Sequence, residues 1–342
     1  MKQKNIYLPN GYLDFGAILD DDYPFSFVIG GRATGKTYGS LKKAKERFEE
    51  LGRTFIYMRR MKSQADLLST DFFNPYKKLN SDLGWNVIPA PVAKGISGFY
   101  NDGSGACMGV IAAFSTFGSF RGFDASTTDL IIYDEFIRNA GERSIRDEGF
   151  QLMNVYETVN RNRELEGLPP VKMVCLSNSN SISNDIYVDL ELVGIAEQQR
   201  KLRKNQFYLP ERGIALYDLT DSEISKQKAD TALYKMDTGG RYTAMSLNNE
   251  YEDYDTSLVK SEPLREFRPL VKIGAVCVYE HKSERRFYVT FHEAGTFPHF
   301  SMTSVEKERF VRKYIYLWEN YLNERISFES FLIKKIFEQL FM

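Results

Sequence analysis

Cysteine and histidine are scarce in this sequence of 342 residues, which has three of each. The cysteines are Cys107, Cys175 and Cys277, and their wide spacing indicates neither a disulfide framework nor a zinc site. Long apolar runs are also missing, whereas a membrane-spanning helix needs about 18 apolar residues. No apolar stretch of signal-peptide length follows the first residues. These absences predict a soluble protein of a reducing compartment, with buried thiols and no membrane partner.

The chain also lacks a surplus of either charge, since 45 Lys and Arg stand against 46 Asp and Glu. A nearly neutral chain has no overall attraction to nucleic acid, so contact with a polyanion must come from local basic patches. Two runs qualify as DNA-binding candidates: Arg59, Arg60 and Lys62 in one, and Arg200, Lys201, Arg203 and Lys204 in the other. Either could hold a phosphate backbone without reading its sequence, although most charge runs are simply solvated.

A phosphate-binding loop is the most informative feature that the chain does contain. It consists of Gly30, Gly31, Arg32, Ala33, Thr34, Gly35, Lys36 and Thr37, which match the pattern G-x-x-x-x-G-K-[ST]. The apolar run 25–29 predicts a strand before the loop, and apolar residues at helical spacing predict a helix after it, ending at Gly52. Backbone N–H groups of such a loop wrap a nucleoside triphosphate. Lys36 would reach the outer phosphates, and the Thr37 hydroxyl would hold Mg²⁺.

Strands and helices alternate over the first two hundred residues. Apolar runs predict strands at 54–58, 106–114, 130–133 and 171–176, and the clearest helix at 150–159. Strands that are apolar throughout suit a sheet covered on both faces. The pattern therefore predicts an α/β fold with a mostly parallel sheet.

Two pairs of polar residues follow predicted strands and complete a candidate NTPase site. Asp134 and Glu135 end one strand, where Asp134 would support Mg²⁺ and Glu135 would orient and activate a water beside the γ-phosphate. Ser177 and Asn178 end another, at the edge of a parallel sheet where ligands bind, so Asn178 is a candidate sensor of the γ-phosphate. The alternative is an ordinary acidic or polar turn at each strand end.

Arginines near the predicted 150–159 helix are candidates for a role between subunits. Arg161 and Arg163 follow this helix, and Arg121 lies in a loop next to Gly122. An arginine supplied by a neighbouring subunit stabilises transition-state charge and is worth roughly 10³–10⁵ in rate. Spacing alone favours the alternative, in which solvated arginines interact with the helix dipole.

The composition shifts in the last third of the chain. We expect a helix from about 221 to 236, a polar and acidic boundary near Asp255, then strands at 271–279 and 286–291 and helices at 305–322 and 328–341. This predicts an ATPase domain over 1–222, a linker or lid over 223–255 and a small α+β domain over 256–342. No Asp occurs beyond Asp255, where 14 Lys and Arg stand against 11 Glu.

With these motifs in view, the chain resembles the DNA-packaging ATPases of small phi29-like phages. The resemblance covers most of the first 250 residues and rests on six ordered stretches: 27–37, 55–60, 133–138, 161–164, 175–178 and 245–249. It implies an ASCE-type P-loop ATPase that uses ATP and Mg²⁺, with Glu135 as the catalytic glutamate and Arg161 as the arginine that acts in trans. It also places Arg121 at a basic position implicated in contact between subunits.

The same resemblance implies a homo-oligomeric ring, usually a pentamer, that pumps double-stranded DNA into a procapsid. The ring would work in the host cell cytoplasm, transiently at the portal vertex, and some relatives also use a packaging RNA. The C-terminal domain would resemble an RNase H-like nuclease that has lost its metal ligands. The missing Asp residues agree with that loss, because magnesium sites of nucleases need clustered carboxylates.

Two other functions compete with this interpretation. A helicase-like or regulatory DNA-binding P-loop ATPase would share the nucleotide site without any capsid. A large terminase with a working nuclease would need metal-binding carboxylates in the last domain, and the missing Asp residues argue against it.

Overall fold

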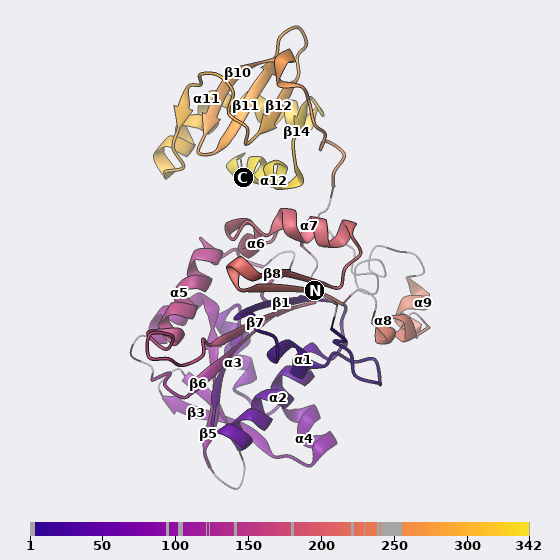
Figure 1. The fold of residues 1–342 in the computed structure, drawn as a ribbon, viewed down its shortest axis with the longest axis vertical. Helices are drawn as coiled ribbons and strands as arrows, with labels where there is room; N and C mark the ends of the chain where they lie inside the picture. The colour runs from indigo at the N-terminus through magenta and orange to yellow at the C-terminus, as the bar shows by residue number, and fades with distance from the viewer. Residues whose placement is uncertain are drawn as a thin grey trace. The chain divides into compact units, whose positions relative to one another are not determined.

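The computed structural model describes residues 4–93, 96–101, 105–120, 122, 124–139, 142–178, 181–219, 222–228, 230–237, 240 and 255–341. The chain divides into two compact units (Figure 1). The first consists of 1–189 and 199–252, and the second of 190–198 and 253–342. The expected three-part division at 222 and 255 stays a prediction, because most of 238–254 lies outside the described residues.

The first unit is built on a nine-stranded sheet in the order β3-β4-β5-β2-β6-β7-β1-β9-β8. Six neighbouring strands are parallel, and the apolar runs of the first two hundred residues predicted five of them. They are β5 (Cys107–Ala113), β2 (Thr54–Arg59), β6 (Thr128–Asp134), β7 (Lys172–Ser177), β1 (Phe25–Ile29) and β9 (Ile214–Asp218). Strand β7 lies between β1, which leads into the phosphate loop, and β6, which carries the acidic pair.

Antiparallel strands extend this sheet at both edges. At one edge β3 (Val87–Ala93) and β4 (Ile96–Asn101) pair with each other and with β5, and at the other edge β8 (Gln206–Leu209) pairs with β9. The pair β3 and β4 was not expected from the sequence. Its strands contain Pro89, Pro91 and Gly98, which are depleted in strands and lower the sequence signal.

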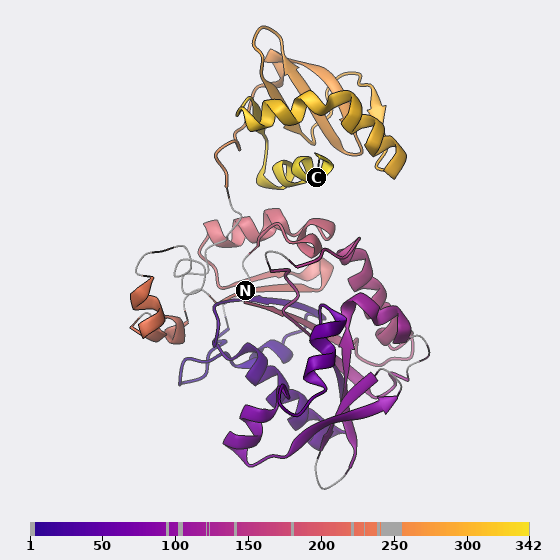
Figure 2. The same cartoon turned by 180° about the vertical axis from the view of Figure 1, so that it is seen from behind.

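Helices cover both faces of the sheet, which explains why the parallel strands are apolar throughout (Figures 1 and 2). Helix α2 (Lys36–Leu51) packs Leu41 and Ala44 into a core with Phe55 and Ile132. On the other face, Phe27 of β1 contacts Tyr187 of helix α6 (Asp185–Asp189), and α6 packs beside α5 (Glu148–Asn160).

The remaining helices of the first unit are short. They are α1 (Phe15–Leu19), α3 (Lys62–Leu68), α4 (Lys77–Leu83), α8 (Glu223–Lys228) and α9 (Ala232–Met236), with 3₁₀ turns at Phe114–Phe120 and Pro210–Arg212. Helix α7 (Val193–Lys201) spans the division between the units. The helix expected over 221–236 is therefore two helices, α8 and α9, with Thr231 as the N-terminal cap of the second.

The second unit contains a five-stranded sheet in the order β13-β10-β11-β12-β14. The strands are β10 (Phe267–Ile273), β11 (Val276–His281), β12 (Phe287–Thr290), β13 (His299–Phe300) and β14 (Ile326–Phe328), and a 3₁₀ turn at Leu264–Glu266 precedes them. Helices α11 (Ser304–Leu322) and α12 (Phe331–Phe341) pack on one face, where Phe310 and Phe337 join Val278 and Val289 in a core.

The expected strand 271–279 is wrong, because two strands meet within it. Gly274 has φ +55 and lies in the turn between β10 and β11, so the chain reverses where an unbroken strand was predicted. Only glycine adopts this left-handed conformation without a steric cost.

In the part of the chain that the structure describes, no helix is both long and apolar enough to cross a membrane.

Candidate nucleotide-binding and catalytic site

The phosphate loop connects β1 to the first turn of α2, as its sequence requires. Gly30 packs so closely that a Cβ there would lie 2.6 Å from the Cβ of Leu219, so no larger residue fits. The buried Lys36 amine folds back onto the loop and donates hydrogen bonds to the carbonyls of Gly30 (2.7 Å) and Gly31 (2.8 Å) and to Thr34 Oγ1 (3.1 Å). The Lys36 ammonium group is thus bound by carbonyl oxygens of the loop, and phosphate oxygens of a nucleotide would take their place.

The surroundings of Lys36 make its charge costly. Burial lowers the pKa of Lys36 to about 7, although Asp134 and Glu135 partly oppose this shift. A lysine that is only half protonated near neutral pH gains charge when an anion arrives. The site is therefore prepared electrostatically for a polyanion.

Asp134, at the end of β6, is the centre of a buried polar cluster. One oxygen, Oδ2, accepts hydrogen bonds from Thr37 Oγ1 (2.9 Å) and Tyr57 Oη (2.6 Å), and from Arg59 Nη1 (3.2 Å). Asp134 is 2 % exposed. A carboxylate beside a hydroxyl is a hard oxygen pair of the kind that Mg²⁺ prefers, so Thr37 and Asp134 fit the expected metal role.

Glu135 lies between two side chains that hold it in place. Arg59 Nη2 donates to its Oε2 (2.7 Å), and Asn178 Nδ2 donates weakly to its Oε1 (3.4 Å). Glu135 also has φ +57, a left-handed conformation that costs a non-glycine residue about 1–3 kcal/mol. The carboxylate that would activate water is therefore already paired with an arginine in this structure.

Arg59 thus belongs to the nucleotide site, and its assignment as a DNA-binding candidate needs correction. It is mostly buried, and both of its ion pairs are to Asp134 and Glu135. Alternation along β2 places Tyr57 and Arg59 on one face of the sheet, next to the end of β6. Alternation indicates that the two side chains share a face, but it does not indicate that β6 is the neighbouring strand.

Arg60 also needs correction as a DNA-binding candidate. Its side chain is 0 % exposed and forms an ion pair with Glu148, the first residue of α5. It points to the other face of the sheet from Arg59 and cannot reach a phosphate backbone. Lys62, in contrast, is exposed and forms an ion pair with Asp66 one turn later.

The second basic run lies at the end of α7 and just after it. Lys201, Arg203 and Lys204 are exposed, and Arg200 is half-buried. The Lys204 amine lies 5.9 Å from the centre of the Phe207 ring. This run and Lys62 keep the exposure that contact with a polyanion would need.

The other predicted residues occupy different places. Ser177 is buried, and its backbone carbonyl accepts the Gly30 N–H (3.2 Å), so it supports the loop. Arg161 is exposed at the C-terminal end of α5, with φ +46. Arg163 is buried and donates to the carbonyls of Ser126 and Thr128, which makes it structural. Arg121 and the stretch 245–249 lie outside the described residues.

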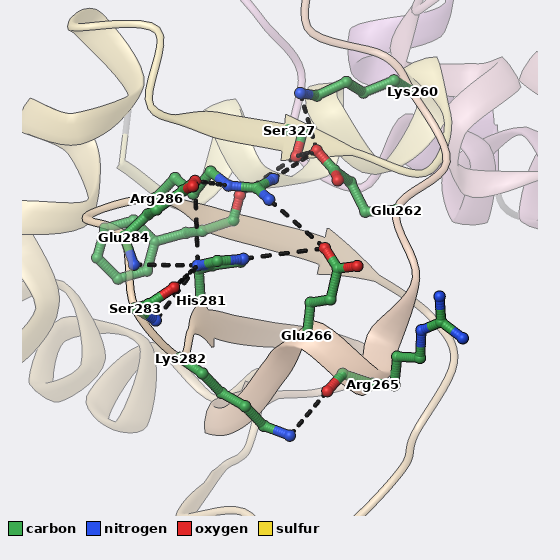
Figure 3. A network of polar contacts seen from close by, with 11 residues as sticks. Lys260, Glu262, Arg265, Glu266, His281, Lys282, Ser283, Glu284, Arg286 and Ser327 are labelled. Atoms are coloured by element: carbon green, nitrogen blue, oxygen red, sulfur yellow. Dashed lines mark hydrogen bonds and ion pairs between the residues drawn. The ribbon is translucent and has the colours of Figure 1, made fainter.

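Three glutamates of the second unit lie around Arg286 (Figure 3). Arg286 donates to Glu262 (2.9 Å) and Glu284 (2.6 Å), and lies 3.8 Å from Glu266. The Nδ1 atom of His281 accepts the Glu284 N–H (3.0 Å). In the described residues, no group of three or more His, Cys, Asp or Glu side chains is placed to hold a metal ion.

The strand order and the site together define a P-loop NTPase of the ASCE class, in which one strand separates the phosphate-loop strand from the acidic strand. A sequence model of one family, described as "Podovirus DNA encapsidation protein (Gp16)", matches residues 3–271. This match spans well over half of the chain, and the chain belongs to that family.

Individual relatives agree with this assignment. The chain is 30% identical over 253 residues to the DNA packaging protein of Bacillus phage phi29, covering 73% of this chain and 67% of that protein. It is 27% identical over 342 residues to the DNA packaging protein of Bacillus phage B103, covering 95% and 98% of the two.

The fold is shared with a solved structure described as "The bacteriophage Phi-29 viral genome packaging motor assembly". The TM-score is 0.66 at 22% identity, over 98% of this chain and 99% of that chain.

Proposed function

We propose that this protein is an ATP-hydrolysing motor that moves double-stranded viral DNA into a preformed capsid. The observation that carries the proposal is the cluster at the end of β6. There Asp134 accepts a hydrogen bond from Thr37 of the phosphate loop, and Arg59 contacts both Asp134 and Glu135. Membership of a family of DNA encapsidation proteins supplies the substrate class.

ATP would bind along the loop 30–37 and the first turn of α2. Lys36 would exchange the carbonyls of Gly30 and Gly31 for phosphate oxygens, which keep its charge compensated. Thr37 and Asp134 would hold Mg²⁺, which neutralises charge on the outer phosphates when bound.

Hydrolysis would require Glu135 to leave Arg59. Arg59 Nη2 donates to Oε2 of Glu135, so this carboxylate oxygen faces the guanidinium rather than a water. Arg59 therefore restrains Glu135 until a rearrangement frees it to orient and activate a water. Asn178, which contacts the other carboxylate oxygen, would report the presence of the γ-phosphate to the same residue.

A homo-oligomeric ring, a pentamer by resemblance, would complete each site with Arg161 from the neighbouring subunit. Arg161 is exposed, and its backbone has φ +46 and ψ −125, a combination that residues other than glycine rarely adopt and that is found preferentially at functional positions. Arg121 remains a second candidate for contact between subunits.

The remaining partners follow from the resemblance. We propose the portal of the procapsid and, where the phage makes one, a packaging RNA, with the ring acting in the host cytoplasm at the portal vertex. The second unit would be a vestigial RNase H-like domain without nuclease activity. Arg286, which occupies the middle of its acidic cluster, supports this proposal.

The test is the substitution Glu135→Gln in the full-length protein. The variant should bind an ATP analogue with unchanged affinity but lose hydrolysis by at least about 10³-fold, because the amide cannot accept the proton of the attacking water. It should also fail to protect DNA from a nuclease in a packaging reaction with procapsids.

The control is Glu50→Gln, which changes an exposed carboxylate in the last turn of α2, away from the site, and should leave both activities intact. Unchanged hydrolysis in Glu135→Gln would contradict the assignment. A wild-type protein that separates DNA strands, but protects no DNA in the presence of procapsids, would instead support the helicase alternative.

A further inference from the structure

The end of β2 presents one arginine to each face of the sheet. Arg59 extends toward the nucleotide site and pairs with Asp134 and Glu135. Arg60, the next residue, extends to the opposite face and pairs with Glu148 of α5. The backbone between two consecutive residues is short and planar, so a shift of one arginine's attachment is felt at the other. The two ion pairs are therefore joined through a single peptide unit.

The contact of Arg60 with α5 is buried and involves only a few groups. Its Nη2 donates to Glu148 Oε1 and to the carbonyl of Arg143 (3.2 Å), and its Nε lies 3.7 Å from Glu142 Oε2. Glu148 is 2 % exposed, and its Oε1 also accepts the Ile145 N–H (3.2 Å). The contact thus fixes the first turn of α5 to the catalytic edge of the sheet.

The contribution of the Arg60–Glu148 ion pair to the stability of the fold does not by itself explain its presence. Two nitrogens of Arg60, Nε and Nη1, are buried without a hydrogen-bond partner in the described part of the chain. Burial also raises the pKa of Glu148, which shows that the site disfavours its charge. Buried ion pairs are often no more stabilising than apolar residues of similar size, and incompletely bonded pairs less so. A role in positioning explains why charges occupy this place.

Helix α5 connects this contact to Arg161. The helix has 13 residues and therefore extends about 20 Å, with Glu148 at its first position and Arg161 as its C-terminal cap. Its C-terminal turn is also held, because Asn160 Oδ1 accepts the Val171 N–H (2.9 Å). Helix α5 is continuous between its two ends, so a tilt of its first turn is transmitted along the helix, with the contact of Asn160 and Val171 as the pivot, and changes the direction of Arg161.

We propose that the ion pair of Arg60 with Glu148 couples two events within one subunit. The state of the Arg59–Glu135 pair in that subunit's nucleotide site sets the position of Arg161, which acts in the site of the neighbouring subunit. Arg60 is in this sense a positioning residue, since it touches neither nucleotide nor water. The inference rests on the proposed function, because it requires that Arg161 acts in trans.

The experiment mixes two defective full-length proteins with duplex DNA and measures ATP hydrolysis. Arg161→Ala protein keeps an intact nucleotide site but has no arginine to offer, and Lys36→Ala protein binds no ATP but keeps Arg161. Their mixture should recover part of the wild-type rate. In a second mixture, the protein that supplies Arg161 (the donor) carries Arg60→Met and Glu148→Leu in addition to Lys36→Ala. These two substitutions nearly keep the side-chain volumes but remove both charges.

We expect this donor to recover a rate about tenfold lower, although it melts at the same temperature and contributes no active site of its own. The matched control donor carries Lys36→Ala and Asp189→Ala. Asp189 accepts the Gly149 N–H (2.8 Å) and so holds the same turn of α5, but within the described residues this hydrogen bond does not involve β2. This donor should recover the full rate of the Lys36→Ala mixture.

Three outcomes decide the matter. Equal recovery with the charge-free donor overturns the coupling, and so does an equal loss with the Asp189→Ala donor, which would show that any loosening of α5 suffices. If the charge-free donor melts at a lower temperature, Glu148→Gln takes its place and the same comparison applies. Failure of the first, simple mixture to recover activity would instead contradict the trans role of Arg161 and with it the proposed function.

Discussion

The residue that most changes the interpretation of this site is Arg59, because it restrains the proposed catalytic base. It donates to both carboxylates of the acidic pair, at 3.2 Å to Asp134 and 2.7 Å to Glu135. Burial works against the charge of Arg59, but Tyr57, Asp134 and Glu135 outweigh it and raise its pKa. The arginine therefore stays charged, and Glu135 is released only by a change of geometry.

Arg59→Met should raise hydrolysis in the absence of DNA. The substitution keeps an unbranched apolar stem but removes the charge-assisted hydrogen bond to Glu135, so we expect about a tenfold increase in the basal rate. The stimulation by DNA should shrink by a similar factor, while the affinity for an ATP analogue changes little. Steady-state hydrolysis with and without duplex DNA measures both rates.

Lys62→Met is the control for Arg59→Met, because it removes a nearby exposed cation whose ion pair is with Asp66, outside the site. Its basal rate should match that of the wild type. A basal rate that falls in Arg59→Met would show that Arg59 assists hydrolysis directly and does not restrain Glu135.

Lys36 should make ATP binding depend on pH. Its pKa is about 7 in the empty site, and phosphate oxygens would favour the charged amine, so binding above pH 7 must take up a proton. We expect uptake of about 0.9 proton at pH 8.5 and an affinity that falls as the pH rises from 7 to 9. Calorimetry in buffers with different heats of ionisation measures the uptake, and Lys36→Arg, which keeps its charge, should abolish it.

The lowered pKa of Lys36 also predicts how the free energy of unfolding changes with pH. The unfolded chain holds the Lys36 proton up to its ordinary pKa of 10.5, whereas the folded chain loses it near 7. Between these values the unfolded state binds more protons, so this residue's contribution to the free energy of unfolding rises with pH. Constant stability of Lys36→Met relative to the wild type across this window would contradict the low pKa.

The sequence alone predicted the residues of the site whose roles depend on local pattern. Lys36, Thr37 and the acidic pair follow from fixed spacings next to apolar strands. The roles of Tyr57 and Arg59 were missed, because they depend on which strands are neighbours. Strand β2 pairs with β6, whose end carries Asp134, and no short stretch of sequence contains that fact. Arg60 was misassigned for the same reason, since its burial comes from α5, almost ninety residues further on.

At the scale of elements, apolar strands were predicted well and irregular ones poorly. Strand β1 was predicted at its observed bounds, Phe25–Ile29, because it is apolar and covered on both faces. Strands β3 and β4 lie at the edge of the sheet, where fewer apolar residues are required and proline is tolerated. The join of β10 and β11 was missed because Gly274 is flanked by apolar residues on both sides, which hides the turn.

Gly274→Ala should destabilise the second unit for two reasons. The left-handed backbone costs alanine about 1 kcal/mol, and the new Cβ would lie 2.7 Å from Cγ of Met302. In a background with Met302→Ala the contact disappears and only the conformational cost remains. Urea unfolding of the four proteins of this cycle measures the difference, and equal losses in both backgrounds would show that Met302 moves aside freely.

At the scale of the whole molecule, near neutrality of charge is consistent with a motor that must hold DNA and release it. With 45 basic and 46 acidic residues, the chain cannot rely on overall attraction, so a few exposed cations must carry the contact. The correction of Arg59 and Arg60 leaves Lys62 and the run at the end of α7 as candidates. Of these, Lys201, Arg203 and Lys204 are exposed together, which makes them the stronger set.

Replacing Lys201, Arg203 and Lys204 by alanine should weaken DNA binding equally for all sequences and flatten its dependence on salt. Each phosphate contact contributes about 0.9 to the slope of log affinity against log salt concentration, so the slope should fall by about 2–3 for each subunit bound. Binding of a labelled duplex between 50 and 200 mM salt measures it. Lys62→Ala should change the slope by less, because Asp66 already compensates this lysine. An unchanged slope in the triple variant would move the DNA contact away from α7, whereas a loss of ATP binding would show that the substitutions had disturbed the fold around β9 and the phosphate loop.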